Sequence, residues 1–347
     1  MKLRNIIGAA ICAATMSVTP ALAQDKKVRL QIGGAFPSTT AILGPAQQRT
    51  VDMLKTMSNG SIDAKMFEPG ALVPANQYFD AVANGSLDAA WTSSAFFTGK
   101  DIAFAAYSTL PFGPEAGELL AWMKYGGGQK LMEDHFKRYK IVVLNCGLIS
   151  PEASGWFRKE INSPEDLKGL KMRFLGLGAN VMQKLGVATQ LLQAGEIFQA
   201  LQLGTIDATE FSMPAMDYTL GFHQIAKYYY FPGWHQMATI THLFISEAKW
   251  AAMSNAQKTI VRTTCDAQML NEFADSEASQ FKVLNELKAK GVNIKFWDKQ
   301  MLDLFQEKWS EVAKEQSEKS PDFKTAYDSL QAFRADYKIW KDHGYLK

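Results

Sequence analysis

The chain has 347 residues, with 37 lysine and arginine residues against 35 aspartate and glutamate residues, so its formal net charge is only +2. Because the basic residues are scattered along the chain, no nucleic acid partner is indicated. The length suits two domains of about 150 residues each, and a hydrophobic content of 47% is ample for their cores.

The N-terminus has the three parts of a secretory signal peptide. Two positive charges in residues 1–4 precede a mainly apolar run from Asn5 to Val18, and Ala21-Leu22-Ala23 forms a cleavage site of the A-x-A type. The apolar run is too short to cross a bilayer, which takes about 20 residues. We therefore expect a signal peptide at residues 1–23, cleavage after Ala23 and a mature protein in the periplasm; the alternative is a buried N-terminal helix.

The remainder of the chain alternates strand-like and helix-like segments. Strands are predicted at residues 28–35, 62–67, 87–91, 141–145, 171–174, 206–211 and 293–296, and helices at residues 45–57, 77–83 and 119–125. Strands that alternate with helices imply mostly parallel sheets covered by helices, which is an α/β fold. From Asn255 onward the pattern is mainly helical.

One segment of the chain is repeated. Residues 79–91 and 198–210 share Phe, Ala, Gly, Asp and Ala at one constant offset, and each copy reads as a helix, a glycine stop and a short strand. Coincidence is the alternative, since such units are common in α/β proteins. The repeat predicts two lobes of similar construction. Trp91 and Glu210 occupy equivalent positions, and because ligands bind beyond the C-terminal ends of strands, both are expected to point at one cleft.

Four later segments resemble those of a known family. They are Gly155–Ile161, Asp166–Arg173, Gly204–Glu210 and Lys227–His235. In this order they resemble the solute-binding subunits of tripartite ATP-independent periplasmic (TRAP) transporters, nearest to the branch that binds 2-oxo and 2-hydroxy monocarboxylates. The resemblance covers nearly the whole mature chain. It implies a two-lobed Venus-flytrap fold that closes on a small organic acid and hands it to a membrane permease.

The resemblance also implies a division of the chain. Lobe 1 would comprise residues 24–148, with residues 240–275 returning to it, and lobe 2 would comprise residues 149–239. Residues 276–347 would form a C-terminal helical segment. The binding cleft would lie between the two lobes.

Individual residues match the family's binding site. Arg173 matches the arginine that pairs with the substrate carboxylate, and a planar guanidinium suits that role because it can grip a carboxylate with two parallel hydrogen bonds. The alternative is a surface arginine that ends a strand. The resemblance further implies a cation that bridges substrate and protein, with Glu210, the backbone carbonyl of Phe211, Gln236 and Glu152 as its ligands.

The chain departs from the family at two of these ligands. Gln236 stands where many relatives have Glu, and Glu152 stands where many have Gln, so the two changes look like an exchange that leaves the ligand charge unchanged. Oxygen ligands alone suit a hard cation such as Na⁺ or Ca²⁺. Alternatively the carboxylates are solvated, or Glu152 and Glu210 hold the amino group of an amine-bearing ligand.

The predicted pocket wall shows a third departure. Ala95-Phe96-Phe97 stands where many relatives have Tyr-Tyr-Trp, which makes the wall more apolar. Adjacent strand residues face opposite ways, so at most one of Phe96 and Phe97 is expected to line the cleft, and both are equally compatible with the core.

Enzyme signatures are incomplete in this chain. Gly176-Leu-Gly178 follows a strand as in a dinucleotide fingerprint, but Val181 replaces the third glycine. Gly126-Gly-Gly128 lacks the ending of a phosphate loop, the five histidines show no H-E-x-x-H pattern, and no G-x-S-x-G elbow occurs. We expect a binding protein without catalytic residues; a secreted hydrolase with a scattered catalytic set is the remaining enzyme alternative.

The cysteines and the C-terminus carry the last signals. Cys146 and Cys265 remain after cleavage, and one pair without close spacing is neither a disulfide framework nor a zinc site. Six bulky residues fall on one face of a helix: Phe323, Tyr327, Leu330, Phe333, Tyr337 and Trp340. This stripe packs either against the chain's own lobes, bracing both across the hinge, or against a twin subunit, since some relatives are dimers joined through an extended C-terminal helix.

Overall fold

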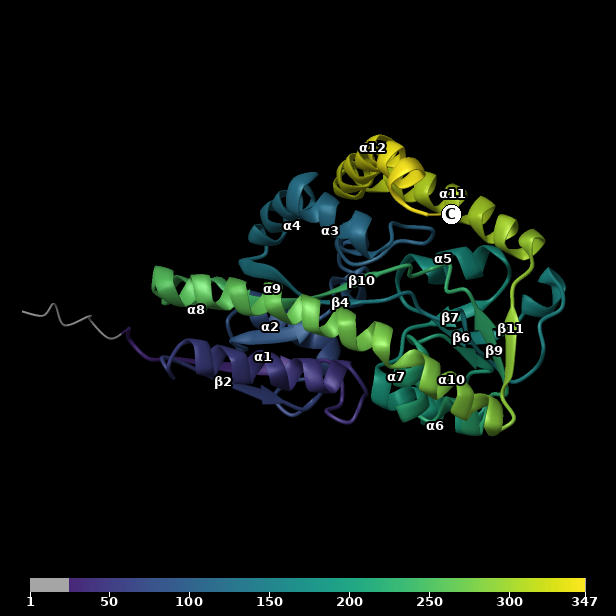
Figure 1. The fold of residues 1–347 in the computed structure, drawn as a ribbon, viewed down its shortest axis with the longest axis horizontal. Coiled ribbons are helices and arrows are strands. Elements are labelled where there is room, and N and C mark those ends of the chain that lie inside the picture. Colours follow the sequence, from purple (N-terminus) through teal and green to yellow (C-terminus); the bar gives the residue numbers. More distant parts are fainter. Residues whose placement is uncertain (1–24, 347) are drawn as a thin grey trace, which may run out of the picture.

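The computed structural model describes residues 25–346, so the predicted signal peptide at residues 1–23 lies outside the described residues. The described chain forms two α/β lobes side by side, each built on one sheet, with long helices over both (Figure 1). The predicted two-lobed α/β fold is therefore confirmed. Within residues 25–346 no helix combines the length and the apolar character that a membrane span requires.

The first lobe contains a five-stranded sheet. Its strands, in spatial order, are β2 (Ile62–Phe67), β1 (Val28–Gly34), β3 (Ala89–Thr92), β10 (Thr239–Ser246) and β4 (Ile141–Ile149). β1 is parallel to β2 and β3, whereas β10 is antiparallel to β3 and β4. The helices of this lobe are α1 (Leu43–Met57), α2 (Tyr78–Ala83), α3 (Ala116–Tyr125), α4 (Gly128–Lys137) and α8 (Glu247–Ala251), with short 3-10 turns at Ala75–Gln77, Ser94–Phe97 and Ile102–Tyr107.

The second lobe contains a six-stranded sheet. Its strands, in spatial order, are β11 (Asn293–Phe296), β9 (Tyr228–Phe231), β5 (Gly155–Phe157), β8 (Ala208–Thr209), β6 (Lys171–Arg173) and β7 (Ala188–Gln190). Its helices are α5 (Gly176–Lys184), α6 (Ala194–Leu203), α7 (Pro214–Thr219) and α10 (Gln280–Ala289), with 3-10 turns at Pro164–Leu167 and Phe222–Gln224. β11 comes from the C-terminal segment, so that segment contributes a strand to this lobe as well as helices.

The two sheets share one topology. The order β2-β1-β3-β10-β4 corresponds to β7-β6-β8-β5-β9, with the same parallel or antiparallel pairing at each step. The repeated sequence supplies equivalent units, in which Gly85 and Gly204 end a helix with φ of 79° and 73°. Asp88 accepts an N–H of β1 and Asp207 accepts an N–H of β6, both at 3.0 Å. The repeat thus ties each short strand to its parallel neighbour.

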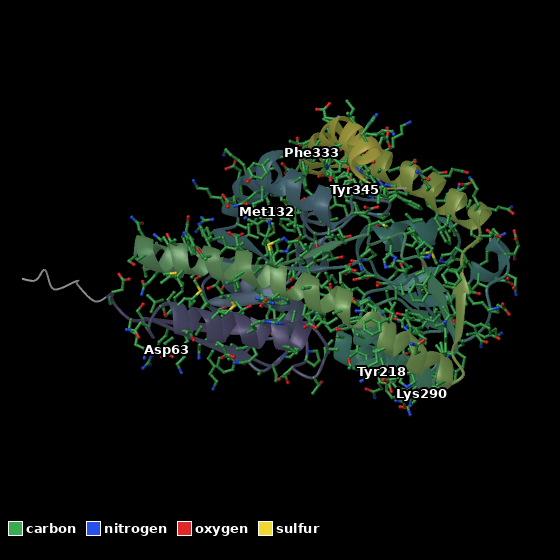
Figure 2. The ribbon with its side chains drawn as sticks, in the orientation of Figure 1. Asp63, Met132, Tyr218, Lys290, Phe333 and Tyr345 are labelled. Carbon is green, nitrogen blue, oxygen red and sulfur yellow. A yellow bond between two sulfur atoms is a disulfide. The ribbon has the colours of Figure 1, made fainter. Side chains whose placement is uncertain are left out.

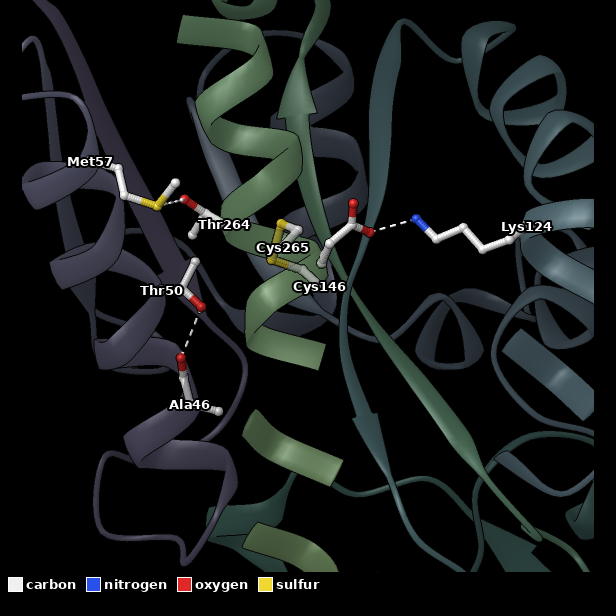
Figure 3. Close-up of a disulfide and its surroundings, with 8 residues drawn as sticks. Ala46, Thr50, Met57, Lys124, Cys146, Thr264 and Cys265 are labelled. Carbon is white, nitrogen blue, oxygen red and sulfur yellow. Dashed lines mark hydrogen bonds and ion pairs between the residues drawn. A yellow bond between two sulfur atoms is a disulfide. The ribbon is translucent and has the colours of Figure 1, made fainter. Parts of the chain in front are cut away.

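Three segments connect the lobes: residues 150–154, residues 232–238, and α9 (Asn255–Ala278), which runs into α10. The disulfide Cys146–Cys265 fixes α9 to β4 (Figure 3). No local pattern marked this bond, because the two cysteines are 119 residues apart and only the packing of α9 on the sheet brings them together. The pair that sequence analysis left outside any framework is therefore a single structural disulfide.

The C-terminal helices lie across both lobes (Figure 1). α11 (Lys299–Lys319) packs on α5 of the second lobe, where Lys184 pairs with Glu315 at 2.6 Å. α12 (Pro321–Gly344) packs on α3, α4 and the Ile102–Tyr107 turn of the first lobe, where Arg138 pairs with Asp322 at 2.8 Å. The chain's own lobes are thus braced by these helices.

The predicted aromatic stripe is only partly covered by the first lobe. Phe323 and Leu330 are fully buried. Phe333, labelled in Figure 2, packs on Gly126 at the end of α3, where a Cβ would come within 2.6 Å of its ring. Trp340, in the last turns of α12, is 58% exposed. The C-terminal end of the aromatic stripe is therefore exposed to solvent.

Candidate ligand-binding site

A small cavity of about 30 Å³ lies where the lobes meet. The first lobe lines it with Phe36, Leu43, Ser93, Phe96, Ile149, Thr239 and Thr241, the second lobe with Arg173, Leu175, Phe211 and Ser212, and the connecting segments with Glu152 and Gln236. One wall is thus apolar with hydroxyl groups, and the other carries charge. This space holds about one or two water molecules. The chain is therefore in a closed form, and Phe36 and Phe211 meet edge to face across the cavity at 6.5 Å.

Two of the connecting segments bring Glu152 and Gln236 together. The N–H of Gly233 donates to the carbonyl of Glu152 at 2.9 Å, and the N–H of Glu152 donates to the carbonyl of Gln236 at 3.1 Å. A Cβ on Gly233 would lie 2.2 Å from the Glu152 carbonyl oxygen. Glycine is therefore required for this close approach, which places both side chains at the boundary between the lobes.

Arg173 ends β6 and is 1% exposed. Its Nη1 donates to both the carbonyl oxygen and the Oε1 of Glu210, each at 2.7 Å, and its Nε donates to the carbonyl of Leu192 at 3.2 Å. The guanidinium also lies 5.3 Å from the centre of the Phe211 ring. The carboxylate of Glu210 additionally accepts the N–H of Leu175. These bonds hold the guanidinium rigidly at the cavity wall.

Glu152 is the centre of a second group of polar side chains. Its carboxylate accepts the hydroxyl of Ser212 at 3.1 Å and the side-chain amide of Gln236. His235 approaches both carboxylates, with Nε2 at 3.7 Å from Glu152 Oε2 and 3.5 Å from Glu210 Oε2. All of these side chains are buried. Two carboxylates, one imidazole and one amide thus converge on a single small volume.

The electrostatics of this cluster follow from burial and charge. Burial raises the pKa of the Glu152 carboxyl to about 7. Burial alone disfavours the charged His235 ring, but the two neighbouring carboxylates outweigh it and raise the pKa of His235 to about 9. Burial also opposes ionisation of Glu210, yet the neighbouring Arg173 charge lowers its pKa. Positive charge is therefore favoured at the point where the two carboxylates meet.

The residues predicted for the site fall into two groups. Arg173, Glu152, Phe96, Phe211 and Gln236 line the cavity. The other three predicted residues, Trp91, Phe97 and Glu210, do not line it. Glu210 stands directly behind Arg173 and bonds to it, so it belongs to the layer that supports the wall.

Trp91 lies behind the cavity wall and is not among the residues that line the cavity. Its side chain is fully buried, and its ring contacts the edge of Phe36, whose own ring forms the cavity wall. Residues 94–97 form a 3-10 turn instead of a strand, but the expectation that at most one of Phe96 and Phe97 lines the cleft agrees with the structure. Phe97 packs into the core against Phe79 and Phe244. Only one of the two adjacent phenylalanines, Phe96, reaches the cavity.

Sequence reasoning missed several site residues. His235 was counted only among histidines without a metal motif, although it directly precedes Gln236. Ser212 follows the predicted ligand Phe211, and adjacency in sequence was the signal available for both. Thr239 and Thr241 lie on β10, and nothing local marked that strand as the cavity wall.

The described residues fit a bound cation. Ligand atoms of Glu152, Glu210 and His235 lie within 4.8 Å of one another. Within residues 25–346, Glu210 Oε2 and both ring nitrogens of His235 are buried without a hydrogen-bond partner. Buried polar atoms of this kind normally have a partner, so the Glu210 oxygen is available to a metal ion, while the protonated His235 ring is available as a hydrogen-bond donor. Carboxylate and amide oxygens suit a hard cation.

Two lobes of one topology, hinged by three segments around a small charged cavity, define a receptor for a small solute. The chain belongs to the family of bacterial extracellular solute-binding proteins, family 7, whose model matches residues 33–320. This confirms the resemblance to TRAP transporter solute-binding subunits. It also confirms that the protein is a transport receptor and not an enzyme, since its relatives are solute-binding proteins.

Individual relatives agree with this assignment. The monocarboxylate 2-oxoacid-binding periplasmic protein of Nostoc is 34% identical over 287 residues, which are 82% of this chain and 78% of that protein. A TRAP solute-binding protein from Bordetella bronchiseptica matches with a TM-score of 0.89 and 33% identity, over 91% of this chain and 94% of that one. Its crystal holds a mixed-occupancy dimer, with copurified calcium and picolinate in one active site. Another, from Pseudoalteromonas atlantica with sodium and pyruvate bound, matches with a TM-score of 0.87 and 29% identity, over 91% and 96%.

Proposed function

We propose that this protein captures a small monocarboxylic acid of the 2-oxo or 2-hydroxy type, together with a bridging Na⁺ or Ca²⁺, and delivers it to the membrane permease of a TRAP transporter. The observation that carries the proposal is a rigidly held, buried arginine in a cavity that also contains a carboxylate cluster. The relatives that bind pyruvate with sodium, or picolinate with calcium, support the same ligand class.

Arg173 is the residue that would bind the acid's carboxylate. Its Nη1 and Nε are held by Glu210 and by the carbonyl of Leu192, so the guanidinium is already oriented before the ligand arrives. A preorganised donor loses little entropy on binding, and a charge-assisted pair in a closed cavity is stronger than one in water. The small cavity favours an acid of few atoms. The remaining ligand atoms would contact the Phe36, Phe96 and Phe211 rings.

The cation would bind between Glu152 and Glu210, with Gln236 and the backbone carbonyl of Phe211 as further ligands. Gln236 at present donates its amide to Glu152, while its Oε1 accepts from Thr239 at 3.2 Å. A rotated amide would offer its oxygen to the cation instead. The exchange of Glu and Gln between positions 152 and 236 keeps one carboxylate at this boundary between the lobes. A bridging cation would thus link ligand and both connecting segments, and would favour closure.

The lobes that close would be residues 24–148 with residues 240–275, and residues 149–239. Closure on the ligand presents one surface to the permease, and a delivered ligand leaves when the lobes part. The mature receptor would begin after Ala23 in the periplasm. N-terminal sequencing of protein purified from the periplasm checks the cleavage site, and a mature chain that begins elsewhere would contradict it.

The ligand itself is identified by mass spectrometry and elemental analysis of protein purified without added acid. A retained monocarboxylate with about one equivalent of Na⁺ or Ca²⁺ supports the proposal. Calorimetry with pyruvate on protein stripped by partial unfolding then gives the affinity. A retained amine, or a lack of binding of pyruvate and other small acids at millimolar concentration, would overturn it.

The cation is tested separately from the acid. Calorimetry is repeated after exhaustive chelation and in sodium-free buffer, with wild-type protein and with Glu152→Gln and Glu210→Gln. If a cation bridges the acid, ion removal weakens acid binding strongly, and each variant weakens it even when ions are present. Acid binding that survives complete ion removal would refute the bridging role. Binding of amines by the same protein would then favour an ammonium group between Glu152 and Glu210.

We further propose that two copies of this chain associate through the C-terminal helix. Apolar residues are exposed at its end: Ile339, Trp340, Tyr345 and Leu346. The Bordetella relative crystallised as a dimer. Light scattering at micromolar concentration should give twice the mature mass, and deletion of residues 321–347 should halve it. The mass of a monomer for the full chain would reject the dimer.

A further inference from the structure

Thr241 is unusual among the hydroxyl groups of the cavity wall. Ser93 bonds to Ser108 at 2.9 Å, Thr239 donates to Gln236, and Ser212 donates to Glu152. Thr241 Oγ1, in contrast, is buried and has no hydrogen-bond partner within the described part of the chain. Its residue lines the cavity and is 2% exposed. A buried hydroxyl normally has a partner, so this one is available to a ligand.

Behind Thr241 stands a buried carboxyl group that the binding site described above does not use. Glu272 lies on α9, the helix that the disulfide fixes to β4 (Figure 3). A Cβ on Gly147 would lie 1.9 Å from Glu272 Oε2 and 2.1 Å from Thr241 Oγ1. The two oxygens therefore lie next to each other in the space that a side chain at position 147 would occupy. Glycine at position 147 makes room for this contact.

Glu272 is short of compensating charge. Its side chain is fully buried, and neither carboxyl oxygen has a hydrogen-bond partner among residues 25–346. The nearby charges Arg49 and Asp275 lie 3.5 Å from each other, so the arginine is shared with a second carboxylate. Burial raises the pKa of Glu272 well above its usual range. Burial therefore favours the neutral, protonated form of this carboxyl group.

The Glu272 carboxyl and the Thr241 hydroxyl lie side by side but are not hydrogen-bonded to each other in this structure. A neutral carboxyl is a hydrogen-bond donor, and the hydroxyl oxygen beside it is an available acceptor, so a small rotation of either side chain would join them. A hydroxyl that accepted from Glu272 would turn its own hydrogen away from Glu272, and the residue that carries it lines the cavity. Thr241 would then present a donor to whatever the cavity holds.

We propose that Thr241, oriented by Glu272, donates a hydrogen bond from the first lobe to the bound acid, so the site selects acids whose second functional group accepts a hydrogen bond, such as the oxygen of a 2-oxo group. This inference rests on the proposed function. Arg173 would hold the carboxylate from the second lobe while Thr241 holds the acceptor from the first. Thr241 is thus a residue of the binding site, and Glu272 is a positioning residue that acts through it.

The test measures pyruvate affinity by calorimetry for a small set of variants. Thr241→Val removes the hydroxyl at nearly constant shape and should weaken pyruvate binding about threefold to tenfold, the effect of one neutral hydrogen bond. Thr241→Ser should stay within about twofold, since it keeps the donor. Thr92→Val is the matched control, because Thr92 is also buried in this sheet but lies outside the cavity lining. Its affinity should match that of the wild type.

A double-mutant cycle tests Glu272. Glu272→Gln keeps a donor beside Thr241 and should preserve affinity, whereas Glu272→Met should weaken binding in the wild type but add nothing in the Thr241→Val background. Equal loss from Glu272→Met in both backgrounds, or no loss in either, would overturn the positioning role. Wild-type affinity in Thr241→Val would overturn the whole inference while leaving the proposed function intact. Failure of wild-type protein to bind pyruvate would count against both. If Glu272→Met does not fold, the pyruvate affinities of Thr241→Val and Thr241→Ser alone still test whether Thr241 donates a hydrogen bond to the ligand.

Discussion

Replacement of Arg173 by alanine tests the binding site and the fold together. The substitution removes three hydrogen bonds, two of them to Glu210 and one to the carbonyl of Leu192. It leaves Glu210 fully buried, with the N–H of Leu175 as its remaining donor in the described chain. Removal of one partner from a buried ion pair costs about 3–5 kcal/mol when the other charge stays buried and uncompensated. Here His235, with Nε2 3.5 Å from Glu210 Oε2, still compensates part of the Glu210 charge, so the cost should lie at or below the lower end of that range. The loss of the ligand carboxylate's partner costs about a further 1.5–3 kcal/mol of binding free energy.

The stability loss should depend on pH. Without Arg173 the pKa of Glu210 should rise, because burial is then opposed only by His235 and the N–H of Leu175. The carboxyl then takes up a proton, which relieves the buried charge. The loss in unfolding free energy should therefore be smaller at pH 5 than at pH 8.

Arg173→Lys separates the two roles of the side chain. A lysine supplies a point charge for Glu210, so it should recover part of the stability. It lacks the planar fork with which Arg173 bonds Glu210 and Leu192 through Nη1 and Nε while Nη2 remains for the ligand carboxylate. Urea unfolding followed by tryptophan fluorescence gives the stability, and calorimetry with pyruvate gives the affinity. Arg158→Ala is the control, because Arg158 also donates to a backbone carbonyl of this lobe but lies outside the cavity lining. Near-native affinity in Arg173→Ala, or a stability loss below about 1 kcal/mol, would refute this account of the site.

Three further substitutions test other parts of the structure. Burial raises the pKa of Asp217 to about 7, so the stabilisation of the fold by the protonated carboxyl is fully present near pH 4 and is lost as the pH rises to about 7. Urea unfolding should show the unfolding free energy falling over that pH range, and Asp217→Asn should flatten the fall. Cys265→Ser opens the 119-residue loop closed by Cys146 and should lower the unfolding free energy by about 2–5 kcal/mol, with an unchanged value marking the bond as unformed in solution. Gly233→Ala places a Cβ 2.2 Å from the Glu152 carbonyl and should cost about 1–3 kcal/mol of stability, together with pyruvate affinity; wild-type values in both assays would contradict the close approach.

The sequence predicted those parts of the fold that depend on local periodicity. The predicted strands Ile62–Phe67 and Asn293–Phe296 have the bounds found in the structure, and the repeated helix-glycine-strand segment correctly indicated two lobes of one construction. The resemblance to a known family pointed to Arg173 as a site residue, and it lines the cavity. The strands were thus predicted from neighbouring residues, the two lobes from a repeated segment, and Arg173 from a family pattern.

The sequence failed where the answer depends on packing between distant segments. Trp91 was expected at the cleft because it follows a strand, but Phe36 from another loop covers it. The contact of Thr241 with Glu272 joins β10 to α9 through a glycine on β4, and no periodicity in any of the three segments records it. The Cys146–Cys265 bond was missed for the same reason.

The position of β10 in the first sheet has a consequence for the order of assembly. β10 lies between β3 and β4, yet it is synthesised after the whole of residues 150–238. Until residues 239–246 arrive, β3 has no partner on one side and β4 has no place in the sheet. Pairings of this long range form slowly, and the open strand edges are prone to aggregation meanwhile. The second lobe has all its strands except β11 within residues 155–231. The first lobe, although it begins the chain, therefore cannot complete its sheet until residues 239–246 have been synthesised.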